Sequence, residues 1–161
     1  MSKRKKIPVG EYKAIITKLS HDGQGIAEIE GKKIFIAHAL PQEEVTFAYT
    51  YVKRQFAQGK AISVQQPHAN RVEPRCEAFA RCGGCSLQHM STEAQIHLKE
   101  NAVRELFHSV AKVNPKTWLA PLVDASWGYR KKARLGVRLV LQKGGVLIGF
   151  REKFSNKIAV I

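Results

Sequence analysis

The stretch IAEIEGKKIFIAHA, residues 26–39, reads as two short apolar strands on either side of Glu30-Gly31. Two such runs joined by a short turn that contains glycine are typical of a β-hairpin. Further runs that alternate apolar and polar residues flank it, and turn residues precede it; the runs are 12–20, 44–54 and 56–65. Five short strands within about 60 residues predict a small antiparallel barrel of the OB type over residues 1–66.

The overall composition limits the class of protein. The chain has 161 residues, of which 44% are hydrophobic, so it can form a folded core. No apolar run reaches the roughly 18 residues that span a bilayer. The basic start MSKRKK is not followed by the apolar segment of a secretory signal. We therefore expect a cytoplasmic protein without a membrane segment, whose cysteine thiols stay reduced.

The basic charge lies mostly at the two ends of the chain. The net charge is +14, and residues 128–161 alone hold nine basic residues and one acidic residue. This balance favours a polyanionic partner, most often nucleic acid, over a basic protein without such a partner. The tail, residues 1–6, is expected to be disordered and available for phosphate contacts.

One candidate nucleic-acid surface lies within the predicted barrel. Lys53 and Arg54 are interleaved with Tyr49, Tyr51 and Phe56. OB-type barrels bind single-stranded nucleic acid through a basic, aromatic face, which these residues could form. Taken one at a time, however, such aromatic residues more often fill or cap the barrel, so both interpretations stay open.

All three cysteines of the chain lie within ten residues, at Cys76, Cys82 and Cys85. Clustered thiols in a reducing compartment indicate a metal site and not a disulfide framework. Gly83 and Gly84 permit backbone angles that other residues avoid, and they let amide N–H groups approach the sulfurs. Zinc with His89 as a fourth ligand and an iron–sulfur cluster both fit this spacing.

The segment after the cysteine loop is expected to be a helix followed by strands. Thr92 and Gln95 fit a capping box that opens a helix over 92–112. Its apolar residues recur near the helical period, which predicts core packing by Ile96, Val103, Leu106, Phe107 and Val110. Two strands, 129–142 and 146–153, are joined by Lys143-Gly144-Gly145 as a hairpin, and 156–161 begins a further strand.

The first of these strands carries a dense basic run. On a strand, side chains two residues apart share a face, which would align Arg130, Lys132, Arg134 and Arg138. Such runs are usually a solvated outer face. Four cations on one side with no acid between them favour a contact with RNA phosphates instead.

Four stretches of the chain together resemble a known family. They are HDGQGIAEIEGKKIFIAHALPQEEV (21–45), CEAFARCGGCSLQH (76–89), WGYRKKARLGVR (127–138) and LIGFREK (147–153). In order and spacing they are similar to bacterial RNA uracil-C5 methyltransferases, above all the branch that methylates 23S ribosomal RNA. The resemblance implies a TRAM domain, an OB-like RNA-binding barrel, over 1–66. It implies an iron–sulfur loop within 67–91 and the first strands of a truncated α+β central domain over 92–161.

The resemblance also implies the chemistry and the partners. A [4Fe-4S] cluster would be held by Cys76, Cys82 and Cys85, with a fourth cysteine beyond Ile161. The S-adenosylmethionine site, the thiolate that attacks uracil C6 and the base would lie in a later domain. We therefore expect no catalytic residue in this chain, no activity from it alone, and a monomer bound to 23S ribosomal RNA. The alternative is a stand-alone RNA-binding module with a structural zinc on the three cysteines and His89.

Overall fold

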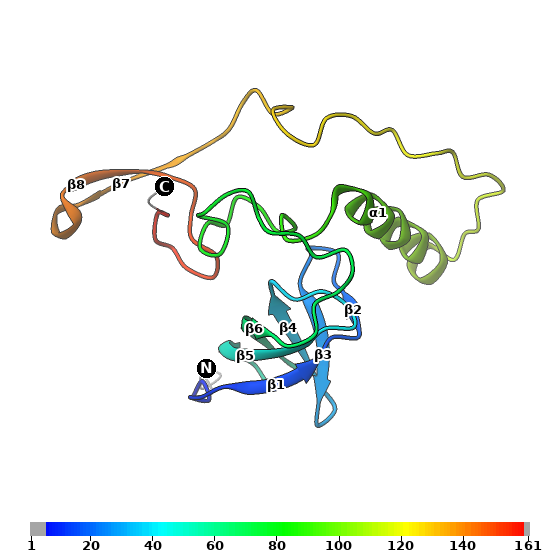
Figure 1. Cartoon of the computed structure of the whole chain (residues 1–161), viewed down its shortest axis with the longest axis horizontal. Coiled ribbons are helices and arrows are strands. Elements are labelled where there is room, and N and C mark those ends of the chain that lie inside the picture. Colours follow the sequence, from blue (N-terminus) through cyan, green and yellow to red (C-terminus); the bar gives the residue numbers. More distant parts are fainter. Residues whose placement is uncertain (1–5, 160–161) are drawn as a thin grey trace.

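The computed structural model of the chain describes residues 6–159, apart from the side chain of Lys143. It consists of a curled sheet, a central loop that carries the cysteines, one helix and a separate two-stranded hairpin (Figure 1). The basic tail expected at 1–6 lies outside the described residues except for Lys6. Within residues 6–159, no helix is both long and apolar enough to cross a membrane.

The curled sheet contains six strands in the order β1-β5-β6-β4-β3-β2. Their bounds are β1 Tyr12–Ile15, β2 Lys18–Leu19, β3 Gly25–Ile29, β4 Lys32–Ala37, β5 Glu44–Val52 and β6 Phe56–Val64. The hairpin expected around Glu30-Gly31 is confirmed as β3 and β4, which pair in antiparallel register. The sheet is not antiparallel throughout, because β4 and β6 pair in parallel. The segment 38–43 carries the chain past β4, and β6 then returns beside β4 in the same direction.

The sheet closes on itself because its two edge strands are neighbours in the sequence. Only Ile16 and Thr17 separate β1 from β2, yet these strands lie at opposite ends of the strand order. The amide of Ile16 donates to the carbonyl of Glu43 at 2.9 Å, and that of Thr17 donates to Ile26 at 2.9 Å. Residues 12–19 therefore act as one bent strand that bonds to both edges, as in a small OB-type barrel.

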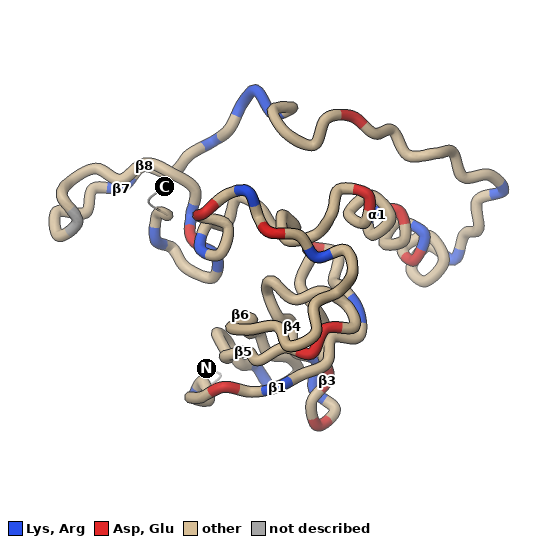
Figure 2. Tube along the Cα trace, viewed as in Figure 1, with Lys and Arg blue, Asp and Glu red and all other residues tan. Residues whose placement is uncertain are grey.

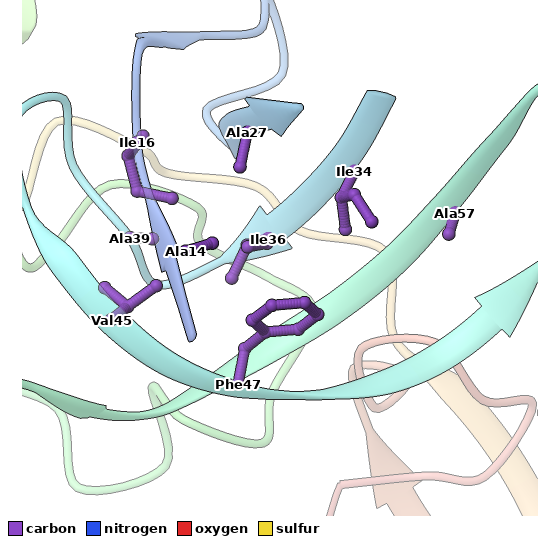
Figure 3. Close-up of a cluster of buried hydrophobic side chains, with 9 residues drawn as sticks. All are labelled: Ala14, Ile16, Ala27, Ile34, Ile36, Ala39, Val45, Phe47 and Ala57. Carbon is purple, nitrogen blue, oxygen red and sulfur yellow. The ribbon is translucent and has the colours of Figure 1, made fainter. Parts of the chain in front are cut away.

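The core lies inside this curl. Figure 3 shows the buried side chains that point inward, among them Ile16, Ile34, Ile36, Val45 and Phe47. Because side chains of a strand point alternately to its two faces, Ile34 and Ile36 both lie on the inner face of β4. A Cβ atom on Gly59 would lie 2.6 Å from the Phe47 ring, so only glycine lets this ring cross β6.

An ion pair ties the linker after the barrel to the barrel itself. Glu43 is fully buried, and its carboxylate accepts from Arg71 Nε at 2.6 Å and Arg71 Nη2 at 2.7 Å. The same carboxylate accepts backbone N–H groups of Leu40 at 2.8 Å and His68 at 3.0 Å. Because a buried carboxylate needs such partners, this contact determines where the chain leaves the barrel and enters the cysteine loop.

The expected helix is present but differs at its start and in its packing. Helix α1 spans Thr92–Leu106 and continues into a π-helical turn, η1, at Phe107–Ala111. Its N-cap is Ser91, whose hydroxyl accepts from the amide of Ala94, so the capping box expected at Thr92 and Gln95 is wrong. The Gln95 side chain instead donates to the carbonyls of Leu87 and Met90.

The apolar stripe of this helix does not pack in a core. Ala94 is the buried residue of α1, whereas Val103, Leu106, Phe107 and Val110 are all exposed. The core packing expected for the stripe is therefore wrong for these four residues, whereas Ile96 is partly buried. Phe107 instead contacts the Trp118 ring in the segment that follows, 5.6 Å away between centroids, and Figure 1 shows that segment running away from the sheet.

The hairpin expected near the C-terminus is confirmed, although it is shorter. Strand β7 spans Gly136–Val140 and pairs antiparallel with β8, Gly145–Gly149. The short 3-10 turn η2, Leu141–Lys143, and the positive φ of Gly144 and Gly145 connect them. The strand expected to begin at Asn156 is reduced to a single bridge between Arg151 and Ile158, and residues 160–161 lie outside the described residues.

Candidate functional site

The cysteine loop is a chain of tight turns held against the segment that follows β8. Within the loop, the Phe79 amide donates to the Cys76 carbonyl at 2.9 Å, and the Cys82 amide donates to Ala78 at 2.7 Å. Two further backbone bonds join the loop to the later segment. Gly83 donates to the Arg151 carbonyl at 2.8 Å, and Lys153 donates to the Arg81 carbonyl at 2.8 Å. The loop is therefore positioned by residues far along the chain.

The two glycines between Cys82 and Cys85 fulfil one of the two roles expected for them and add a third. Neither has a positive φ, so the expectation of unusual backbone angles is wrong. A Cβ atom on Gly83 would lie 2.8 Å from the Arg151 carbonyl oxygen, and one on Gly84 would lie 3.1 Å from the Phe150 ring. Their role is close packing against residues 150–151. The expected approach to sulfur is present, because the Gly84 amide donates to Cys82 Sγ at 3.4 Å.

The three thiols differ in their surroundings. Cys82 is buried, Cys76 is partly buried and Cys85 is exposed. In the part of the chain that the structure describes, no three His, Cys, Asp or Glu side chains are close enough together to hold one metal ion. In donor type the loop fits a soft metal centre, since it offers three sulfurs and a backbone N–H directed at one of them.

His89, the ligand considered for zinc, is a buried side chain. Among the described residues it does not form a metal-binding group with the cysteines. It is 1% exposed, and neither ring nitrogen has a hydrogen-bond partner among the described residues. Its ring lies 5.4 Å from that of Phe79 and 6.1 Å from that of His38, measured between centroids. Burial, with the charge of Arg71, lowers the pKa of His89 to about 4, so the imidazole is neutral at pH 7.

Lys153 is a site residue that the sequence reading missed. Its ammonium donates to the Phe79 carbonyl at 2.9 Å and lies 2.8 Å from His38 Nε2, at the end of β4. Burial lowers the pKa of Lys153 to about 8, against the opposing effect of the Cys85 and Cys82 thiols. Burial and the Lys153 charge lower the pKa of His38 to about 3, so a neutral His38 accepts this bond. Lys153 therefore joins the barrel to the cysteine loop.

The basic and aromatic residues of the barrel are brought together in part. Lys53 and Arg54 are exposed in the turn between β5 and β6. The Lys53 ammonium lies 5.7 Å from the Tyr51 ring and 5.6 Å from the Phe56 ring, both measured to the centroid. Phe35 belongs to the same group, because the centroid of its ring lies 6.0 Å from that of Phe56. Sequence reasoning missed it, although its position between the buried Ile34 and Ile36 on β4 indicates that it points to the outer face.

The remaining aromatic residue of this candidate surface belongs to the core. The Tyr49 ring packs edge-on against Phe47 at 5.0 Å and Tyr12 at 4.9 Å between centroids. For Tyr49, filling the barrel is therefore the correct interpretation. Burial and the neighbouring Tyr12 raise the pKa of its hydroxyl, so it stays neutral.

The basic run before β7 does not form the expected strand face. Arg130, Lys132 and Arg134 lie in an extended segment outside any sheet, and only Arg138 lies in β7. The partner strand explains this, because β8 ends at Gly149 opposite Gly136 and offers no backbone partner to residues before Gly136. All four side chains are exposed, and Figure 2 shows Lys and Arg along the segment that leads into β7.

Comparison with known proteins identifies the barrel as a TRAM domain and finds relatives that match nearly the whole chain. The TRAM domain model matches residues 7–62, which is the whole of the curled sheet except the last two residues of β6. A relative from Nitrosococcus oceani, named 23S rRNA (uracil(1939)-C(5))-methyltransferase RlmD, is 51% identical over 99% of this chain. Relatives of the same name from Methylococcus capsulatus and Alcanivorax borkumensis are 47% and 48% identical over 97% and 98% of it.

Over almost its whole length the chain is therefore similar to the N-terminal part of these uracil-C5 methyltransferases. It matches the N-terminal part of these longer proteins and spans about a third of their length, at 36%, 35% and 35%. The TRAM match ends before the linker, so the cysteine loop lies outside that domain. The Glu43–Arg71 ion pair and the bond between Lys153 and His38 are two of the polar contacts that hold the linker and the cysteine loop on the TRAM domain.

Proposed function

We propose that this chain supplies the RNA-binding and metal-binding part of an enzyme that methylates C5 of a uridine in 23S ribosomal RNA. The observation that carries the proposal is the 51% identity over 99% of the chain to a relative with that name. On this proposal the protein is cytoplasmic and binds its RNA as a monomer.

The reaction explains why a large binding surface is needed. Uracil C5 becomes nucleophilic only after a thiolate adds to C6, and the base must first be turned out of the RNA fold. S-adenosylmethionine, when bound, supplies the methyl group as a sulfonium. On this proposal the residues for these steps lie in a catalytic domain that these 161 residues do not contain, so they are inactive alone. Their part is to bind the RNA and orient it.

Two groups of cations carry the RNA binding in this proposal. The Lys53 ammonium lies over the partly buried Tyr51 and Phe56 rings, and Arg54 is exposed in the same turn of the TRAM barrel. Arg130, Lys132 and Arg134 lie in the extended segment, and Arg138 lies in β7, where it donates to the Asn156 carbonyl at 3.2 Å; all four side chains are exposed. Exposed cations in an extended segment are free to follow a phosphate backbone, and each contact makes the affinity depend on salt.

The salt dependence of RNA binding tests this assignment. The double variant Lys132→Glu/Arg134→Glu is compared with Lys112→Glu/Lys116→Glu, which changes the charge equally beyond helix α1. For single-stranded RNA, the slope of log affinity against log salt should fall by about 1.4 in the first variant, since each lost phosphate contact removes about 0.7. The control should keep the wild-type slope to within about 0.7. Equal slopes in the two variants contradict the proposal.

We further propose that Cys76, Cys82 and Cys85 hold a [4Fe-4S] cluster. Support comes from the three soft donors and from the Gly84 N–H directed at Cys82 Sγ. When bound, the cluster keeps the loop in one conformation at the RNA interface and takes part in no redox step. A fourth ligand is required from outside residues 1–161, because a cube prefers four thiolates.

A structural zinc is the competing assignment, and His89 is the observation in its favour. Its ring is buried and both of its nitrogens lack partners among the described residues, as an unused ligand would. Purification without oxygen separates the two. Brown protein with iron and sulfide supports the cluster, whereas colourless protein with one zinc supports a stand-alone RNA-binding module. The variants Cys85→Ser and His89→Phe then report which residue the metal content depends on.

A further inference from the structure

A groove of about 720 Å³ lies beside the cysteine loop, outside the TRAM domain. One wall is the loop itself, from Gly84 to Gln88, and the other is the connector from Ser126 to Arg130. Residues at the start of helix α1 also line the groove. The connector contacts this helix through the Thr92 and Ser126 hydroxyls, which lie 3.4 Å apart. Hollows of this size are large enough to hold a small ligand or part of a polymer.

The groove carries two aromatic rings that are not buried. Trp127 is 48% exposed and Tyr129 is 65% exposed. The Arg75 guanidinium carbon lies 4.7 Å from the centroid of the Trp127 ring, and that of Arg130 lies 5.7 Å from the Tyr129 ring. Exposed rings with arginines stacked on them are the pattern of surfaces that bind unpaired bases.

The charged side chains that line the groove are more often basic than acidic. Arg75, Lys99 and Arg130 line it, against the acids Glu73 and Glu93. Arg75 and Arg130 are also the side chains that stack on the two rings. A base on a ring and its phosphate on the neighbouring guanidinium would therefore be bound together. A duplex cannot use these rings, because its bases are already stacked inside the helix.

We propose that this groove binds an unpaired stretch of RNA, with a base stacked on Trp127 and its phosphates on Arg75 and Arg130. The inference rests on the proposed RNA function and adds to it a particular site and a preference for single strands. Since Cys85 lines the same groove, RNA bound there would lie directly against the cysteine loop. Sequence reading did not find the site because Arg75 and Trp127 are brought together only by the fold.

The test measures binding of the 161-residue chain to two fluorescent RNAs by anisotropy. One is a single strand of about 12 nucleotides and the other is a blunt duplex of similar length. Trp127→Ala should weaken single-strand binding by about tenfold, the lower part of the range for losing one stacked base. Duplex binding should change less than about twofold, and the salt slope should stay that of the wild type because no phosphate contact is removed.

Trp118→Ala is the matched control. The centroid of its ring lies 4.3 Å from the Arg104 guanidinium carbon, a similar stacked pair, but this pair joins helix α1 to the segment after η1 and lies outside the groove. This variant should bind both RNAs as the wild type does. In a Trp118→Phe background, Trp127 is the remaining tryptophan, so its fluorescence should be quenched by the single strand and not by the duplex.

The possible results separate the two proposals. If the wild type binds neither RNA, the proposed RNA function fails and this inference fails with it. If the wild type binds single strands and Trp127→Ala binds them equally well, only the groove inference is overturned. Equal weakening on single strand and duplex also overturns it, because the ring would then act without stacking on an unpaired base.

Discussion

Replacement of Arg71 by methionine should destabilise the TRAM barrel more than any exposed charge change. Arg71 makes three hydrogen bonds, two to the buried Glu43 carboxylate and one of 2.8 Å to the His38 carbonyl. Methionine keeps much of the apolar stem but none of the donors. Glu43, which is 0% exposed, would keep only the backbone N–H groups of Leu40 and His68.

The size of the effect follows from leaving one partner of a buried pair alone. Such losses cost about 3–5 kcal/mol. The two remaining N–H donors still stabilise the Glu43 carboxylate and favour the lower end, so we expect about 3 kcal/mol. For a barrel of this size, each kcal/mol shifts the melting temperature by about 4–8 °C, which predicts a fall of roughly 12–24 °C.

The same pair predicts a pH dependence. Burial alone would raise the pKa of Glu43, but the hydrogen bonds from Arg71, His68 and Leu40 outweigh it and hold the pKa below its ordinary value of 4.5. A lowered carboxyl pKa stabilises the fold fully above the unfolded value, and this stabilisation is lost as the pH falls through the folded value. The gap between wild type and Arg71→Met should therefore be constant near neutral pH and narrow below about 4.5.

Urea unfolding followed by far-ultraviolet circular dichroism measures this difference. Tryptophan fluorescence is unsuitable, because Trp118 and Trp127 both lie outside the barrel. Arg104→Met is the matched control, since it removes a pair of equal length, 2.6 Å to Glu100, on the half-exposed surface of helix α1. It should cost no more than about 0.5 kcal/mol. A loss below about 1 kcal/mol for Arg71→Met, or an equal loss in both variants, would refute the reasoning.

Three further outcomes follow from single contacts. Gly83→Ala should destabilise the cysteine loop by about 1–3 kcal/mol, because its Cβ would lie 2.8 Å from the Arg151 carbonyl oxygen; faster alkylation of the loop thiols, mapped by mass spectrometry, measures it. Burial gives Lys153 a folded pKa of about 8, below its ordinary 10.5, so the unfolded chain binds more protons between these values and stability rises with pH there. In urea titrations of the metal-free chain, Lys153→Met should flatten that rise, and an unchanged profile would exclude Lys153 as its source. Ser91→Ala should cost helix α1 about 1 kcal/mol, since the hydroxyl caps the Ala94 amide; hydrogen exchange in the first turn that stays at the wild-type rate would contradict this.

The barrel could be predicted because its signals are local. The apolar runs on either side of Glu30-Gly31 predicted the hairpin of β3 and β4. Both turn residues have a positive φ in the structure, which glycine adopts readily. The parallel pairing of β4 with β6 could not be read in the same way. It depends on where segment 38–43 crosses the barrel, and that path is set by the buried Glu43 and its distant partner Arg71.

The helix shows the limit of periodicity. A period near 3.6 correctly predicted α1, but it does not say whether the apolar stripe has a partner. Likewise, alternation before β7 suggested a strand through Arg130 and Lys132, although a strand requires a neighbour with free backbone groups. Both errors have one cause, since a pattern states what a segment could pack or pair with and not whether that partner is present.

The sequence by itself determined the elements and the donor chemistry: the TRAM barrel, the three clustered thiols, the helix and the basic C-terminal segment. Only the tertiary structure decided what surrounds them. It placed Lys153 between His38 and the cysteine loop, showed that Gly83 is there for contact with Arg151, and brought Arg75 onto Trp127. These are contacts between residues far apart in the chain, and their energy depends on burial and distance, which no local pattern encodes.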